Sequence, residues 1–191
     1  VLFLLAAQIS KVEPLNRFVG IFRRAGDVAA VFRRHLDQCP HKFDLSGNVL
    51  QQTDGFVRHI LFSQSAAVLL LLQEQKIPAA MATATNQEIA REYLSKTGLA
   101  AFFDQLVFGD QVRRGKPDPE IFLCAAQDLG VSPERSVVLE DSLNGVLAGI
   151  QGGFRTIMVP DMTQPPPKLE QQLFCKCENL FQVIGCLREL L

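Results

Sequence analysis

Short apolar runs alternate with amphipathic segments from about residue 65 to the end of the chain. Each run suits a strand that is covered on both faces, and each intervening segment repeats its apolar residues at helical spacing. Strands that alternate with helices form parallel β-α-β units. We therefore predict a three-layer α/β, Rossmann-like core with a parallel sheet over residues 65–191. The predicted strands are residues 79–82, 106–108, 137–139 and 155–159.

Local signals place the ends of several helices. Thr85 and Glu88 form a capping-box pattern, and Gly98 is suited to closing the helix that follows them. Asp118 and Pro119 are typical of a helix start, with the proline at the first helical position. The predicted helices are residues 66–75, 86–96, 120–129, 143–151, 169–174 and 180–191.

Residues 1–64 carry less distinct signals. Apolar residues between positions 15 and 36 recur at helical spacing with arginines on the other side, which predicts a mainly helical N-terminal segment. A solvated helix surface accounts for those arginines more simply than a nucleic-acid face does. The three histidines, His35, His41 and His59, fit no metal-binding spacing and are interpreted as ordinary surface or boundary residues.

Composition narrows the class of protein. The chain has a hydrophobic fraction of 48%, a charged fraction of 20% and a formal net charge of −1, so no nucleic-acid or membrane partner is expected. Five irregularly spaced cysteines argue against a disulfide framework and for a reducing, cytoplasmic compartment. Cys175 and Cys177 could form part of a metal site, but no matching cluster lies nearby in sequence. Two buried or half-buried thiols are the simpler interpretation.

Polar residues follow the predicted strands at three places, which are Thr83, Lys116 and the pair Glu140 and Asp141. An acidic pair ahead of a helix is a common way to start one, because acids are favoured near the positive end of the helix dipole. Parallel strands, however, bring all their carboxyl ends to one edge of the sheet, where open α/β sheets bind ligands. We therefore expect the three clusters to converge.

The converging side chains suit a phosphoryl-transfer site. The Thr83 hydroxyl and the backbone N–H groups that open the next helix can hold phosphate oxygens, and Lys116 supplies a positive charge. Carboxylates such as those of Glu140 and Asp141 suit Mg²⁺. The chain has no glycine-rich nucleotide-binding motif of either common type. The predicted substrate-binding residues are Thr83, Ala84, Thr85, Asn86 and Lys116.

Four sequence strings resemble those of haloacid dehalogenase-like hydrolases, in the branch of β-phosphoglucomutase and the small sugar-phosphate phosphatases. They are Met81–Thr85, Arg114–Phe122, Val138–Gly145 and Ile157–Asp161. The resemblance covers residues 65 to 191. It implies that Thr83 binds the phosphoryl group, that Lys116 steadies this group and the nucleophile, and that the two acids, Glu140 and Asp141, hold Mg²⁺ directly or through water.

One motif of that family is missing from the sequence. The family's nucleophile and its general acid or base come from an Asp-x-Asp-Gly-Thr string at the end of the first strand, and no such string occurs here. Residues 43–48 are the only string that partly matches this motif. In that string Asp44 is the candidate nucleophile, and Ser46 stands in place of the acid. Residues 1–64 are interpreted either as part of a helical cap or as an altered N-terminus that packs differently.

Three functions are compatible with these residues. The first is a Mg²⁺-dependent phosphatase of a small phosphomonoester, such as a sugar phosphate, that works through an aspartyl-phosphate. A phosphoglucomutase-type transferase would share every motif present here. A catalytically inactive phosphate-binding or interaction protein would keep the phosphate and metal pockets without the nucleophile.

Overall fold

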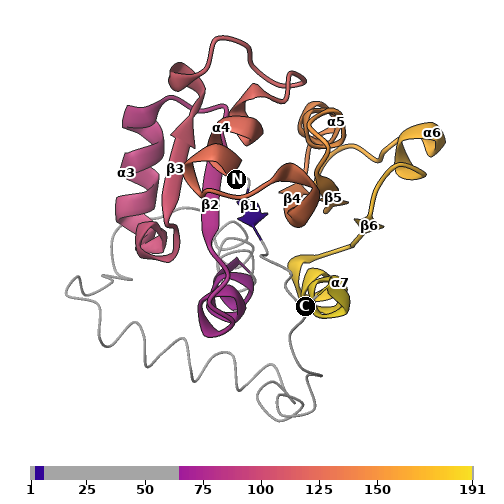
Figure 1. Ribbon diagram of the computed structural model, residues 1–191, viewed down its shortest axis with the longest axis horizontal. Coiled ribbons are helices and arrows are strands. Elements are labelled where there is room, and N and C mark those ends of the chain that lie inside the picture. Colours follow the sequence, from indigo (N-terminus) through magenta and orange to yellow (C-terminus); the bar gives the residue numbers. More distant parts are fainter. Residues whose placement is uncertain (1–2, 7–64, 191) are drawn as a thin grey trace, which may run out of the picture.

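The computed structural model describes residues 3–6 and 65–190 of the chain, and within them six strands form one sheet (Figure 1). The order across the sheet is β3-β2-β1-β4-β5-β6. The strands are β1 (Phe3–Ala6), β2 (Ala79–Thr83), β3 (Gln105–Phe108), β4 (Ser136–Glu140), β5 (Arg155–Met158) and β6 (Cys175–Lys176). Two pairs of strands are parallel and helices pack on both faces of the sheet, which confirms the predicted α/β fold class.

The predicted strands pair in parallel, as expected, but the strand at the centre of the sheet does not. β2 pairs with β3, and β4 with β5, in parallel, whereas β1 is antiparallel to both of its neighbours, β2 and β4. Phe3 is opposite Met81 on one side and Leu139 on the other. The apolar run in β1 has no feature that sets its direction, so the sequence pattern did not reveal this arrangement. The rest of the predicted helical segment, residues 7–64, lies outside the described residues.

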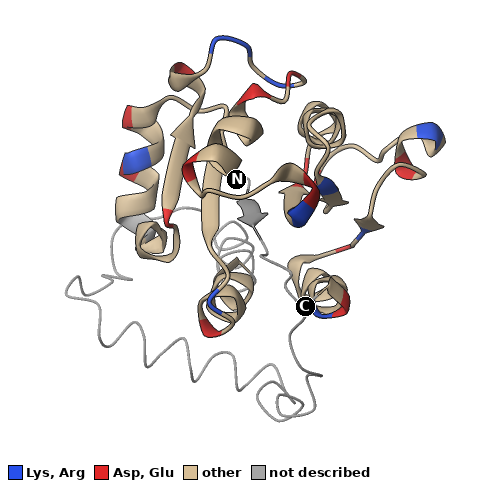
Figure 2. Ribbon diagram, in the orientation of Figure 1, with Lys and Arg blue, Asp and Glu red and all other residues tan. Residues whose placement is uncertain are grey.

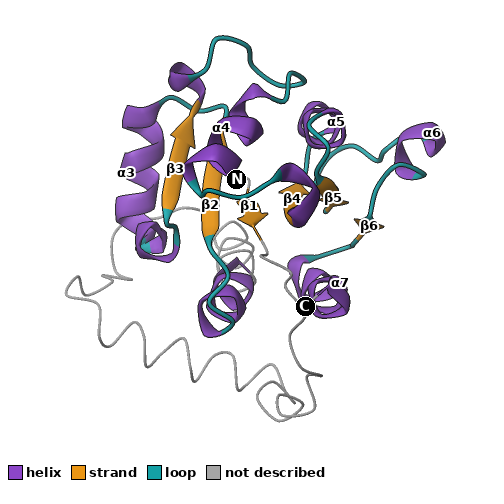
Figure 3. Ribbon diagram, viewed as in Figure 1, coloured by secondary structure: helices purple, strands orange, loops and turns teal. Residues whose placement is uncertain are grey.

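Helices cover both faces of the sheet (Figure 3). The helix over residues 65–74 packs with α3 and α7 on one face, and α4 and α5 lie on the other. Lys and Arg are interspersed with Asp and Glu over these helices and the loops (Figure 2). No helix in the described part of the chain is both long and apolar enough to cross a membrane. The labelled helices are α3 (Gln87–Thr97), α4 (Glu120–Asp128), α5 (Leu143–Gln151), α6 (Pro167–Glu170) and α7 (Leu180–Leu190).

Side-chain alternation along the strands supplies the two apolar layers. Val137 and Leu139 point into the layer with α7, whereas Val138, between them, points into the layer with α4. Because helices cover both faces of the sheet, neither face is exposed to solvent, and the strands are therefore continuous apolar runs in the sequence.

Two local predictions differ from the structure. The helix α3 is capped by Asn86, whose side chain accepts a hydrogen bond from Ile89 N at 3.0 Å, so the predicted cap at Thr85 is wrong by one residue. The predicted helix 169–174 is displaced toward the N-terminus, because α6 spans Pro167–Glu170. The chain then turns to pair with β5, and Phe174 N donates to Thr156 O at 2.9 Å. The left-handed C-cap at Gly98, with φ 67°, is as predicted.

Candidate functional site

The carboxyl ends of β2 and β4 lie at the same edge of the sheet, with the amino end of β1 between them. Thr83 is the last residue of β2, and Glu140 is the last residue of β4. Two strand spacings separate them, which corresponds to about 10 Å. This edge is where the predicted phosphate and metal residues meet.

Lys116 and Glu140 form the central contact of the site. The Lys116 ammonium donates to Glu140 Oε1 at 2.9 Å, and the two side chains are only 10% and 0% exposed, respectively. The same ammonium lies 4.7 Å from the centroid of the Phe122 ring, within the range of a cation–π contact. The peptide bond between Lys116 and Pro117 is cis. Two partners from different elements thus fix a single positive charge at the sheet edge.

The second oxygen of Glu140 organises the start of helix α5. Glu140 Oε2 accepts hydrogen bonds from Asp141 N at 2.8 Å, from Ser142 N at 2.9 Å and from the Ser142 hydroxyl at 3.1 Å. Gly145, in the first turn of α5, has no room for a side chain, because a Cβ at that position would overlap the Glu140 carboxylate. The Glu140 carboxylate therefore turns back against the first turn of α5, where it is shielded from solvent.

Burial and charge act in opposite directions on Glu140. Burial raises the pKa of its carboxyl group, whereas the Lys116 ammonium and the Ser142 N–H lower it, and a contact with the Asp141 carboxyl raises it again. The net direction is upward. A buried carboxylate is stable here only because it has several donors.

The loop that presents Lys116 is tied down by Glu120. This carboxylate accepts from Arg113 N at 2.8 Å and from Arg114 N at 3.1 Å, and the Arg114 side chain also reaches Asp118 at 3.1 Å. The N–H of Arg113 and then those of Arg114 lower the pKa of Glu120. Charged residues of both signs follow one another along this loop between β3 and α4. The network positions the residues on either side of Lys116.

The Thr83 side of the site is built from backbone contacts. Thr83 Oγ1 accepts from Thr85 N at 3.2 Å, and Thr85 O accepts from Gly109 N at 3.1 Å, which ties the loop to the end of β3. A hydroxyl that accepts one bond still has its own proton to donate. Ala84 and Thr85 are exposed in this loop, whereas Asn86 uses its side-chain oxygen to cap α3.

The structure brings together only part of the predicted site. Lys116 and Glu140 are in direct contact, and Thr83 is at the same edge two strands away. Asp44, the candidate nucleophile, lies outside the described residues. The four residues of β1 occupy the central position next to this edge and include no carboxylate.

Several supporting residues were not identified from the sequence. Ser142 and Gly145 lie within a string that was singled out, but their roles depend on Glu140 turning back onto α5. Phe122 was visible only as an apolar position of a helix. Its place beside Lys116 depends on how α4 packs on the sheet.

Of the two acids, Asp141 fits a magnesium ion better. A carboxylate offers about four lone-pair sites, and Glu140 already receives hydrogen bonds from Lys116, from Asp141 N and from both donors of Ser142. Asp141 is half-buried at the same strand end. Its oxygens are of the type that Mg²⁺ prefers, so the donor set fits a hard cation bound mainly through Asp141.

Comparison with known proteins identifies the family of the chain. The family model described as "Hydrolase: haloacid dehalogenase-like hydrolase" matches residues 10–153. Phosphorylated carbohydrates phosphatase of Thermotoga maritima is 46% identical over 89 residues, which are 47% of this chain and 41% of that protein. Hexitol phosphatase A of Escherichia coli is 39% identical over 93 residues, 49% of this chain and 43% of that protein. The chain thus spans less than half the length of these relatives.

A similar fold occurs in a solved structure of a haloacid dehalogenase family hydrolase from Deinococcus radiodurans, which has bound phosphate and sodium. The two structures superpose with a TM-score of 0.59 at 23% identity, and the match covers 91% of this chain and 78% of the other. At this level of identity the likeness supports the fold.

Proposed function

The chain belongs to the haloacid dehalogenase-like hydrolases, and from that premise we propose that it acts as a Mg²⁺-dependent phosphatase of a small phosphomonoester of the sugar-phosphate class. The observation that carries the proposal is the buried Lys116–Glu140 pair at the carboxyl end of β4. It holds an ammonium group against Glu140, the residue before Asp141, and across the sheet edge from Thr83. Phosphoryl transfer depends mainly on such positioning and charge neutralisation.

Each residue has a separate task in this proposal. Lys116 neutralises phosphoryl oxygens with a charge that Glu140 and the Phe122 ring keep in place. Thr83 donates its hydroxyl proton to another phosphoryl oxygen. Asp141 would hold Mg²⁺, which when bound supplies further neutralisation of the phosphate charge.

The nucleophile in this proposal is the carboxylate of Asp44. One of its oxygens forms a bond to phosphorus as the bond to the bridging oxygen breaks, and the departing alkoxide takes a proton from solvent water. A second water then attacks phosphorus, which releases inorganic phosphate and restores the Asp44 carboxylate. An aspartate suits this role because its carboxylate is ionised at neutral pH and needs no base to activate it. Relatives that the chain resembles are named as phosphatases of phosphorylated carbohydrates and hexitols, which supports this substrate class.

Turnover of an aryl phosphate with Mg²⁺ tests the proposal. We expect Asp44→Asn to abolish phosphate release and Asp141→Asn to lower it at least about tenfold. Asp128→Asn, at the exposed end of helix α4, is the control and should leave turnover unchanged. Undiminished turnover in Asp44→Asn would show that another group is the nucleophile.

An inactive phosphate-binding protein is the second candidate. It is favoured by one observation, namely that β1 occupies the central position of the sheet and has no acidic residue. This candidate predicts that orthophosphate and Mg²⁺ raise the melting temperature while no phosphomonoester is hydrolysed. A phosphoglucomutase-type transferase would instead convert a sugar 1-phosphate into another sugar phosphate without releasing phosphate, which product analysis would show.

A further inference from the structure

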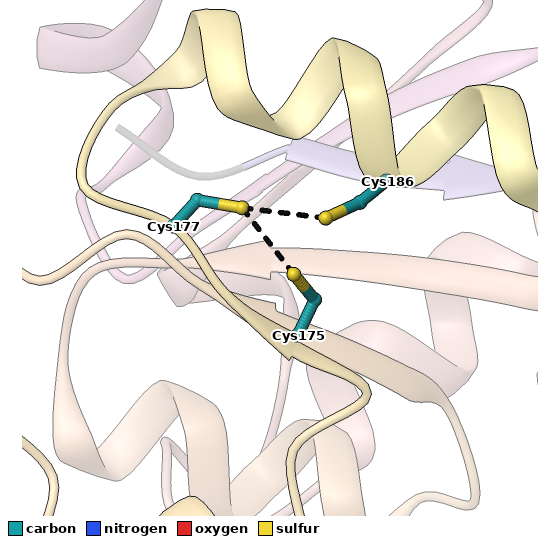
Figure 4. Close-up of side chains that lie close together, drawn as sticks. All are labelled: Cys175, Cys177 and Cys186. Carbon is teal, nitrogen blue, oxygen red and sulfur yellow. Dashed lines mark hydrogen bonds between the residues drawn. The ribbon is translucent and has the colours of Figure 1, made fainter.

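Three thiols that are separated in the sequence meet beside the last strand of the sheet. Cys175 and Cys177 flank Lys176 at the end of β6, and Cys186 comes from helix α7 (Figure 4). The sulfur of Cys177 lies 3.5 Å from that of Cys175 and 3.6 Å from that of Cys186. All three sulfur atoms lie within 4.8 Å of one another.

The backbone explains why the first two thiols share a face. Cys175 pairs with Ile157 of β5, and Cys177 N donates to Met158 O at 2.9 Å, so the segment is extended. Side chains two residues apart in an extended segment point the same way. Both thiols therefore face helix α7.

Helix α7 supplies the third thiol from its buried side. Val183 and Leu187 are buried in the core, and Cys186 lies beside them, half-buried, on the same side of the helix. The turn that leads into α7 is fixed at both ends. Glu178 N donates to the Gln182 side chain at 2.9 Å, and Gln182 N donates to the Asn179 side chain at 3.1 Å. The position of Cys186 relative to Cys177 is thus set by ordered backbone on both sides.

We propose that Cys175, Cys177 and Cys186 bind a zinc ion through three thiolates, with the fourth position taken by a ligand from solvent. Tetrahedral zinc with Zn–S bonds of about 2.3 Å places its sulfur ligands about 3.8 Å apart. The two short contacts, at 3.5 and 3.6 Å, need to lengthen only slightly to match this spacing. Within the described residues, no His, Asp or Glu joins the three thiols as a further ligand.

Charge favours a divalent over a monovalent thiophilic ion. Three thiolates around Zn²⁺ carry a net charge of about −1, whereas the same thiolates around Cu⁺ carry about −2. Burial makes the larger net charge more costly. Burial, followed by contact with the other thiols, raises the pKa of Cys177. Zinc binding to this thiol would therefore release a proton.

The thiol cluster lies in the apolar layer with helix α7, whereas Lys116 of the proposed phosphate site contacts Phe122 in the layer with α4, on the other face of the sheet. The cluster lies C-terminal to residues 10–153, the part of the chain that the family model matches. Bound zinc would connect β6 to α7 and so hold the final helix on the sheet. The inference does not depend on the proposed phosphatase activity.

Titration of the full chain with Zn²⁺ in reducing buffer, against a chromophoric zinc indicator, tests the proposal. We expect one zinc ion per chain, and zinc binding at least about tenfold weaker in Cys175→Ser and in Cys186→Ser. Cys124→Ser removes a half-buried free thiol on helix α4 and serves as the matched control. Circular dichroism shows whether each variant is folded.

A second measurement uses the unaltered chain and needs no folded variant. Zinc should slow alkylation of the half-buried thiols Cys175 and Cys186, and a chelator should restore their reactivity. Failure of the wild-type chain to take up zinc, unchanged binding in Cys186→Ser, or alkylation that zinc does not slow would each overturn the proposal.

Discussion

The carboxylate of Glu140 shows how single residues organise the candidate site. It is buried, yet it receives hydrogen bonds from Lys116, from Asp141 N and from Ser142. An ionised carboxylate in this position is stabilised by the donors around it, and each donor is in turn oriented by the carboxylate. Changes to these residues should therefore affect stability as well as phosphate binding.

Removing the ammonium of Lys116 should destabilise the fold. In Lys116→Met the buried Glu140 carboxylate loses its cationic partner, and we expect the free energy of unfolding to fall by about 3–5 kcal/mol in urea titrations at neutral pH. Lys168→Met, on the exposed side of α6, is the control and should change it by less than about 0.5 kcal/mol. If the ion pair is the cause, adding Glu140→Gln to the first variant should restore part of the loss.

The contribution of Glu120 to stability should depend on pH. Its pKa is lowered from 4.5 in the folded chain, so it stabilises the fold above pH 4.5, and this stabilisation is lost as pH falls through the lowered pKa. Glu120→Gln should therefore be less stable than wild type at pH 7, with a difference that narrows below pH 4.5. Urea midpoints of both proteins between pH 3 and pH 7 measure it. A difference that is constant over this range would rule out the ionised form as the cause.

At the scale of elements, two helical glycines give opposite predictions. Gly145 in α5 lies against the Glu140 carboxylate, whereas Gly185 in α7 has nothing within 4 Å of an added Cβ. We expect Gly145→Ala to destabilise by about 1–3 kcal/mol through overpacking. Gly185→Ala should stabilise by about 0.5–1 kcal/mol, because alanine favours a helix. Thermal unfolding of the two variants measures both changes in stability. Equal changes in Gly145→Ala and Gly185→Ala would contradict the close packing of Glu140 against α5.

The elements from β2 onward were largely predictable from sequence. Buried strands read as apolar runs, helix ends follow glycine and polar caps, and α5 begins and ends where predicted. The convergence of Lys116 with Glu140 follows from the parallel order of the strands. The short strand β6 was not predictable, because two residues give no periodicity and its pairing with β5 is a tertiary effect. Nor could sequence spacing show that the turn after Cys177 brings Cys186 back to it.

At the scale of the whole molecule, β1 connects two halves of the sheet. β2 and β3 lie on one side of it, and β4, β5 and β6 lie on the other. β2 and β4 do not pair with each other, because β1 lies between them and pairs with both. The direction of β1 cannot be read from its four apolar residues. Its position between β2 and β4, which are far apart in the sequence, is set by tertiary packing and not by local sequence.

A proline in β1 tests this connection. Leu4→Pro removes a backbone donor from a strand that is paired on both sides, and we expect a loss of about 1–3 kcal/mol in the free energy of unfolding. Met162→Pro, in an exposed loop, is the control. Urea unfolding followed by circular dichroism gives both values. A wild-type midpoint for Leu4→Pro would mean that β1 is not part of the cooperative sheet.

The direction of β1 also decides which of its residues lies beside the proposed phosphate site. Phe3, at its amino end, lies at the edge where Thr83 and Glu140 end their strands. Because β1 is antiparallel to β2 and β4, its amino end rather than its carboxyl end shares this edge with them. A group attached to Phe3 would therefore lie at the edge of the proposed phosphate site, whereas a group attached to Ala6 would lie at the other end of the strand, opposite Ser136.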